Sequence, residues 1–184
     1  MAQAGSPRSR RPARERYTRH PVKTLLIVYH SLTGGTRQMA EAAARGAHSE
    51  PEIATRLLTA AEADGGDLLA ADGYIFAAPE NLAALAGRMK DFFDRAYYVA
   101  LDRINGRPYA VLICAGSDGQ NAARQIARIT TGWRLRSIAA PLIVCTHAQT
   151  SEAILAAKQI PDAELRRCEE LGAAFTAGLA AGIF

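Results

Sequence analysis

The segment "TLLIVYHSLTGGTRQMAEAA", residues 24–43, decides the fold that the sequence predicts. Its first six residues are an apolar and aromatic run typical of a buried strand, and its alanine-rich end is typical of a helix. Between the two, "HSLTGGT" supplies hydroxyls and glycines instead of side chains that pack. A strand that passes through a short turn into a helix is the first half of a β-α-β unit.

Four further apolar runs follow along the chain, and segments with helical periodicity separate them. The runs are residues 52–58, 72–78, 109–115 and 141–146. The first of these alternates like an edge strand, whereas the others are nearly continuous in apolar residues, like strands covered on both faces. Alternating strands and helices favour parallel strands joined by right-handed crossovers. We therefore predict an α/β fold, a three-layer doubly wound sandwich with a five-stranded parallel sheet in the order 2-1-3-4-5.

The segments between the runs have helical faces. In residues 87–100 the apolar positions recur every three or four residues, so one stripe is expected to pack on the sheet, and Asp91 and Arg95 form an i, i+4 pair on the opposite face. Trp133 and Tyr97 lie on such stripes, which favours core or subunit packing over cofactor stacking. Gly46 is at a position expected to end the first helix.

In this fold a ligand binds at the carboxyl ends of the strands, between strands 1 and 3 where the order reverses. The loop after strand 1 combines free helix N-terminal amides, hydroxyls and glycines, which suits a single phosphate group. It contains no GxxxxGK[ST] or complete GxGxxG motif. An equally open alternative is that Thr33 caps the helix and the glycines only turn the chain.

Two further loops end at the same edge of the predicted sheet. After strand 3, "APENLAALAG" places Pro79 where it removes a backbone donor, and after strand 4, "AGSDGQN" offers small residues and free amides against which a flat heterocycle could lie. Each loop also has an ordinary interpretation as turn or connector chemistry.

Charge along the chain is uneven. Residues 1–23 hold seven basic residues and one acidic residue, so fifteen basic and seventeen acidic residues follow, although the whole chain has a formal net charge of +4. We expect residues 1–22 to be a disordered basic leader and residues 23–184 to form one domain. Apart from Tyr17 the leader lacks aromatic residues, which argues against nucleic-acid binding.

The remaining composition excludes several other classes of protein. No apolar run is long enough to cross a membrane, so we expect a soluble protein without a membrane partner. Cys114, Cys145 and Cys168 are widely spaced, which argues against a metal site and fits a reducing, cytoplasmic location.

Three motifs together resemble the flavodoxin-like superfamily, and most closely its NAD(P)H-dependent FMN or quinone reductases, over nearly all of residues 24–182. "HSLTGGT" is similar to the family's FMN-phosphate loop, "FAAPENLAALAGRMKDFFDR" to its strand-proline loop and following helix, and "GRPYAVLICAGSDGQ" to its flavin loop after strand 4.

The resemblance implies that residues 23–184 bind FMN non-covalently and that no side chain need act as a nucleophile or base, because the chemistry belongs to the cofactor. The implied phosphate ligands are Ser31, Thr33, Gly34, Gly35 and Thr36. The implied contacts of the isoalloxazine are, on one edge, Pro79, Glu80, Asn81 and Leu82 and, on the opposite side, Gly116, Ser117, Gly119 and Gln120.

The implied function is an oxidoreductase that passes reducing equivalents from NAD(P)H through FMN to a quinone, flavin or similar small acceptor, in a possible homo-oligomer. The alternatives are a one-electron carrier for a partner protein and a non-catalytic module. Electron-carrying flavodoxins usually stack aromatic residues on the flavin, and the loops after strands 3 and 4 contain none, which favours an open flavin face. The family often has a glycine where residues 82–86 stand.

Three other residues are candidates with weaker support. His30 begins the phosphate loop and could line it, and Arg37 could assist the phosphate or lie on a solvent face. His147 follows the last strand and could contact the acceptor or nicotinamide, although a lone loop histidine is more often a surface residue.

Overall fold

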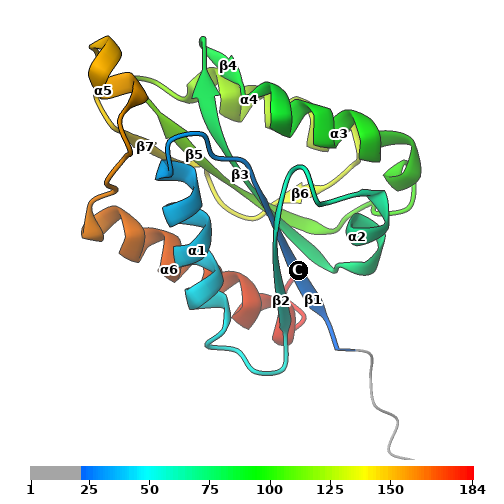
Figure 1. Cartoon of the computed structure of the whole chain (residues 1–184). Helices are drawn as coiled ribbons and strands as arrows, with labels where there is room; N and C mark the ends of the chain where they lie inside the picture. Colours follow the sequence, from blue (N-terminus) through cyan, green and yellow to red (C-terminus); the bar gives the residue numbers. More distant parts are fainter. Residues whose placement is uncertain (1–21) are drawn as a thin grey trace, which may run out of the picture.

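The structure, a computed structural model, describes residues 22–184 and has a mixed sheet between two helical layers (Figure 1). The predicted leader, residues 1–22, lies almost wholly outside the described residues. The longer strands are β1 (Thr24–Tyr29), β2 (Ala54–Thr59), β3 (Gly73–Asn81), β5 (Pro108–Ala115) and β7 (Leu142–Cys145). They are parallel and occupy the positions predicted from their apolar runs. β2 is at the edge, as its alternating pattern predicted.

The predicted count of five strands is wrong, because residues 22–184 form a sheet of seven. The path is β2-β1-β3-β5-β6, with β4 paired to β3 and β7 also paired to β5, so the order 2-1-3-4-5 holds only for the longer strands. β4 (Ala84–Leu85) runs antiparallel to β3 because the chain turns back on itself after Asn81. β6 (Arg136–Ser137) and β7 pair with successive parts of β5, and Pro141, which lacks a backbone N–H, lies in the gap between them.

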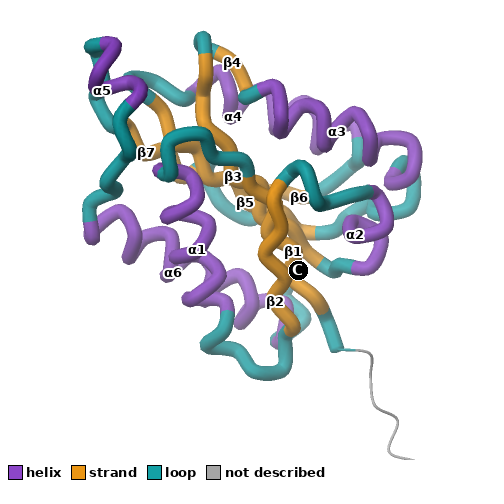
Figure 2. Tube along the Cα trace, viewed as in Figure 1, coloured by secondary structure: helices purple, strands orange, loops and turns teal. Residues whose placement is uncertain are grey.

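Helices cover both faces of the sheet (Figure 2). α1 (Gly35–Ala47) and α6 (Asp162–Ala180) pack on one face. The other face is covered by α2 (Gly65–Ala70), α3 (Gly87–Ala100) and α4 (Gln120–Gly132). The predicted apolar stripe of α3 is buried at Met89, Phe92, Phe93, Ala96 and Ala100, and Asp91 pairs with Arg95 at 2.9 Å. The fully buried Trp133 packs against Phe93 and Tyr97, which confirms its core position.

The expectation that Gly46 ends the first helix is wrong, since α1 continues to Ala47 and His48 is its C-cap. Gly46 instead allows α1 and α6 to touch. A Cβ at Gly46 would overlap the carbonyl oxygen of Glu169 in α6, and a Cβ at Gly172 in α6 would overlap the carbonyl oxygen of Ala43 in α1. The absence of side chains at both positions therefore sets the separation of the two helices.

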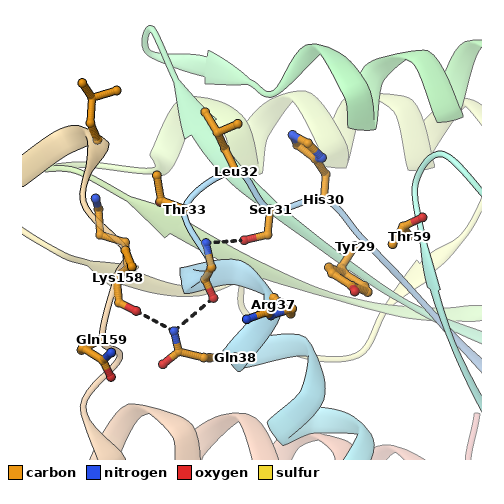
Figure 3. A pocket seen from close by; sticks show the side chains of 13 residues that line it. Tyr29, His30, Ser31, Leu32, Thr33, Arg37, Gln38, Thr59, Lys158 and Gln159 are labelled. Carbon is orange, nitrogen blue, oxygen red and sulfur yellow. Dashed lines mark hydrogen bonds between the residues drawn. The ribbon is translucent and has the colours of Figure 1, made fainter.

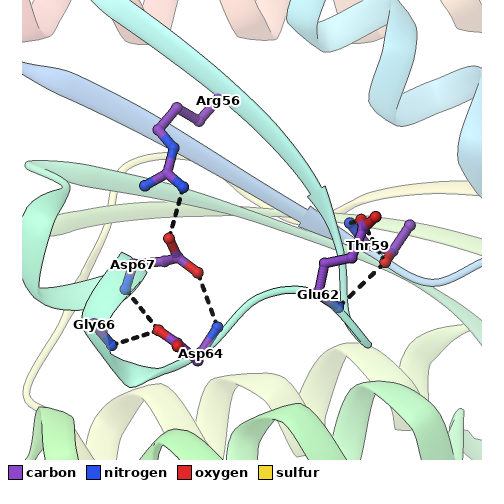
Figure 4. Close-up of polar contacts among 6 residues, drawn as sticks. All are labelled: Arg56, Thr59, Glu62, Asp64, Gly66 and Asp67. Atoms are coloured by element: carbon purple, nitrogen blue, oxygen red, sulfur yellow. Dashed lines mark hydrogen bonds and ion pairs between the residues drawn. The ribbon is translucent and has the colours of Figure 1, made fainter.

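The short helix α2 was not predicted, because its Gly-Gly start has low helix propensity. A capping box stabilises it (Figure 4). The Asp64 carboxylate accepts hydrogen bonds from the N–H groups of Gly66 and Asp67 at 2.7 and 3.1 Å, and the Asp67 carboxylate accepts one from the Asp64 N–H at 3.0 Å. Arg56 in β2 donates to Asp67 at 2.6 Å, which ties the helix to the edge strand.

Within residues 22–184, no helix combines the length and the apolar character needed to span a lipid bilayer. All three cysteines are free.

Candidate functional site

The loop from His30 to Thr36 has the geometry of an anion cradle. Gly34 is the N-cap of α1 with φ of 87°, a left-handed conformation that favours glycine, and no side chain caps the helix, so Thr33 is not a cap. The Ser31 hydroxyl accepts a hydrogen bond from the Gly34 N–H at 3.1 Å, which fixes the turn (Figure 3). The first hydrogen bond of the helix runs from the Gln38 N–H to the Gly34 carbonyl, so the preceding amides have no acceptor within the helix.

Thr36 adds an unsatisfied hydroxyl to this cradle. Its side chain is 1% exposed, and its Oγ1 has no hydrogen-bond partner among the described residues. The thiol of Cys114 lies beside it, but a thiol bonds weakly and no hydrogen bond of normal geometry joins the two. A buried polar atom without a partner is costly, so Thr36 has the character of a ligand-binding group.

The three predicted loops meet around one cavity of about 480 Å³, a volume in the usual range of ligand pockets. The predicted site residues that line it are Ser31, Thr33, Gly35, Thr36, Pro79, Glu80, Asn81, Leu82, Gly116 and Ser117. Gly34 lines the neighbouring cavity, and Gly119 and Gln120 line neither of the two. No aromatic side chain lines this cavity, in the part of the chain that the structure describes.

Glu80 joins the second and third loops. Its carboxylate accepts hydrogen bonds from the backbone N–H groups of Gly119 and Ala122, each at 2.9 Å, and so caps α4 from the end of β3. Gly119 has φ of 79°, and a Cβ there would lie 2.6 Å from Ile143. Gly119 therefore determines the backbone shape of the loop between β5 and α4.

The turn between β3 and β4 is strained. Leu82 and Ala83 both have positive φ, 52° and 56°, a conformation that favours glycine. Asn121 in α4 donates to the Ala83 carbonyl at 2.6 Å and holds this turn. The Leu82 side chain is fully exposed at the rim of the cavity, so the turn presents an apolar side chain to a ligand.

A second cavity of about 720 Å³ (Figure 3) shares residues 31–33 with the first in its lining. Its lining includes His30, Arg37, Gln38 and Lys158 and no carboxylate among the described residues. His30 is half-buried, and its pKa is lowered from the ordinary value, first by burial and then by the charge of Arg88. His30 thus begins the loop, whereas the Arg37 side chain is exposed and lies 3.7 Å from Glu41 on the same helix.

His147 lines neither cavity; it is exposed, with φ of 54°, and its backbone N–H donates to the Gly116 carbonyl at 2.8 Å.

Sequence reasoning missed the side chains that reach the site from the segment after β7. The helix α5 (Ser151–Leu155) supplies Ile154 and Leu155 to the rim of the 480 Å³ cavity, and Lys158 lines both cavities. No motif marks these residues, and only the folded chain brings them to a loop more than a hundred positions earlier. Burial raises the pKa of the Cys114 thiol, which lies beneath the cradle and also lines the 480 Å³ cavity.

Comparison with known proteins gives consistent matches. The model of a family described as NADPH-dependent FMN reductase matches residues 59–150, half of the chain. A flavodoxin of Aquifex aeolicus is 33% identical over 105 residues, covering 56% of this chain and 55% of that protein. An NAD(P)H dehydrogenase (quinone) of Acidithiobacillus ferrooxidans is 35% identical over 91 residues, covering 39% of this chain and 46% of that protein. The chain thus spans about half the length of the curated relatives it matches.

Solved structures resemble this chain over most of its length. A flavodoxin from the domain Archaea superposes with a TM-score of 0.69 at 18% identity, covering 85% of this chain and 99% of that one. At that identity the likeness shows the flavodoxin-like fold alone.

Proposed function

This chain belongs to the NADPH-dependent FMN reductase family, and from that premise we propose that it binds FMN in the 480 Å³ cavity and works as an NAD(P)H-dependent oxidoreductase. The acceptor in this proposal is a quinone, a free flavin or a similar small molecule. The observation that carries the proposal is the unpartnered Thr36 hydroxyl at the base of the cradle, because a phosphate oxygen would satisfy it.

The residues of the cavity divide into two ends. At one end, Ser31, Thr33, Gly34, Gly35 and Thr36 would hold the phosphate through hydroxyls and backbone N–H groups. At the other, the loops that contain Pro79–Leu82 and Gly116–Ser117 would hold the isoalloxazine, with Gly119 and Gln120 setting the shape of their loop. Bound FMN would supply the redox chemistry, while the protein binds and orients it. The absence of aromatic side chains from the described lining leaves room for a nicotinamide or an acceptor.

The test is equilibrium binding of FMN to the purified full chain, followed by steady-state oxidation of NADPH and of NADH with a panel of quinones. We expect FMN to bind and at least one of the two donors to be oxidised in an FMN-dependent manner. If FMN binds but neither donor is oxidised, the enzymatic part of the proposal is wrong.

The second candidate is an electron carrier for a partner protein, and the similarity to the Aquifex aeolicus flavodoxin favours it. It predicts two separate one-electron steps in a reductive titration and no direct turnover of NAD(P)H. Absence of any FMN-dependent rise in melting temperature would favour the third alternative, a non-catalytic module. A homo-oligomer and a cytoplasmic location stay predictions.

A further inference from the structure

The segment that follows α5 is fixed against the phosphate loop by its backbone. The Lys158 N–H donates to the Thr33 carbonyl at 2.8 Å. The Gln38 side-chain amide donates to the Lys158 carbonyl at 2.7 Å (Figure 3). The Ile160 N–H donates to Gln38 Oε1 at 3.2 Å. Two hydrogen bonds thus hold the backbone of Lys158 beside the cradle, and a third holds that of Ile160, without any contribution from the Lys158 ammonium group.

The ammonium group of Lys158 has only neutral partners. Its Nζ donates to the carbonyls of Ala153, Ile154 and Ala156 at 2.7, 2.8 and 2.7 Å. Among residues 22–184 no carboxylate lies within ion-pair distance of it. No carboxylate of the described residues therefore pairs with the charge of this lysine, and its three N–H donors are bonded to neutral carbonyls.

Positive and negative side chains line different parts of the 480 Å³ cavity. Lys158 is the one cationic side chain in its lining among the described residues, and the lining carboxylates are Glu80 and Asp118, in the two loops assigned to the isoalloxazine. A Cβ at Gly35, the first residue of α1, would lie 3.3 Å from the Lys158 Cβ, so the lysine stem starts beside the helix N-terminus. The stem of this lysine thus starts at the phosphate end of the cavity, and its Nζ lies at the carbonyls of α5.

We propose that Lys158 supplies the positive charge that pairs with the phosphate of FMN and makes the site select FMN over riboflavin. This inference rests on the proposed function, since it assumes that the cavity holds a flavin. The flexible four-carbon stem of lysine allows Nζ to turn from the carbonyls of α5 to a phosphate while the backbone stays fixed. The phosphate loop has no lysine of its own, and residue 158 takes that role from a distant part of the chain.

The experiment compares the dissociation constants of FMN and of riboflavin, which lacks the phosphate, for the wild type and for Lys158→Met, Lys158→Gln and Lys158→Arg. We expect Lys158→Met and Lys158→Gln to weaken FMN binding about tenfold or more, since a charge-assisted hydrogen bond is lost, and to leave riboflavin binding within about twofold. Lys158→Arg should retain most of the FMN affinity. The matched control is Lys90→Met, in an exposed pair with Asp94 on α3, which should change neither constant.

Riboflavin binding separates this proposal from a structural role of Lys158 in holding α5. If Lys158→Met and Lys158→Gln weaken both flavins equally, or neither, the proposal is overturned while the proposed function stands. If the wild type binds neither flavin, both are overturned. High salt should weaken FMN binding more in the wild type than in Lys158→Met, because salt screens the pair.

Discussion

The carboxylate of Glu80 at the end of β3 accepts a hydrogen bond from the backbone N–H of Gly119 at the start of α4, at 2.9 Å. A second bond from Ala122, also at 2.9 Å, uses the other carboxylate oxygen. Glu80 therefore fixes the position of one cavity loop relative to another. Its side chain stabilises the site by joining the loops.

Replacing Glu80 tests this relationship. Glu80→Ala leaves two N–H groups of α4 without their acceptor, and we expect the free energy of unfolding in urea to fall by about 1–3 kcal/mol. Glu80→Gln keeps one acceptor oxygen, so its free energy of unfolding should lie between those of the wild type and Glu80→Ala. The control, Asp94→Asn in an exposed pair on α3, should change stability by less than about 0.5 kcal/mol. Wild-type stability in Glu80→Ala would show that these bonds do not hold the loops.

Replacing Thr36 should affect the stability of the protein and its affinity for FMN in different ways. Thr36→Val removes the unpartnered hydroxyl and keeps the shape, so we expect the FMN-free protein to be as stable as the wild type or more stable. FMN binding should weaken about tenfold, because a hydrogen bond to the phosphate is lost.

The comparison variant is Thr36→Ser, which keeps the hydroxyl and should keep the FMN affinity while losing about 1 kcal/mol of stability with the methyl group. A clear loss of stability in FMN-free Thr36→Val would mean that the hydroxyl already has a partner within the protein.

The fold was predictable where local pattern and burial agree. The apolar runs at Leu25–Val28 and Ile75–Ala78 lie in strands covered on both faces, and their carboxyl ends bring the first two site loops to one cavity. The extra strands β4 and β6 have two residues each, too few to form a pattern. The pairing of β4 depends on the strained turn after β3. The pairing of β6 depends on where the chain leaves the edge of β5.

The parts of the site that sequence did not predict depend on long-range contacts. Lys158 stands in an ordinary loop, and its long-range hydrogen bonds to Thr33 and Gln38 place it at the cradle. Glu80 was predicted at the flavin edge because of its loop, but the partners of its carboxylate come from α4. Gly46 looked like a helix end because the partner helix that requires a glycine there is more than a hundred residues away.

The close contact of α1 and α6 gives a prediction about stability. In Gly46→Ala and Gly172→Ala the added Cβ would overlap a backbone carbonyl of the other helix, and backbone cannot move without separating the helices. We expect each variant to lose about 1–3 kcal/mol of unfolding free energy or more, measured by denaturant titration. Gly87→Ala is the control, because a Cβ there has no atom within 4 Å. It should be neutral or slightly stabilising. An equal effect in all three variants would refute the role of the helix contact.

His30 gives a prediction about pH. Burial, and then the charge of Arg88, lower the pKa of His30 from its ordinary value of 6.5. Above the pKa of His30 in the unfolded chain, the imidazole is neutral in both the folded and the unfolded state, so it makes no pH-dependent contribution to stability. As the pH falls through that value, the unfolded chain binds a proton before the folded protein does. The free energy of unfolding therefore decreases until the lower pKa of the folded protein is reached. His30→Gln should therefore lose less stability than the wild type between about pH 7 and pH 5.

Histidine NMR titration measures the pKa directly. Arg88→Gln should raise the pKa of His30 towards 6.5 at low salt, because one of the two causes is removed. A His30 pKa above 6.5 in the FMN-free protein would contradict the partly buried position that the structure gives it.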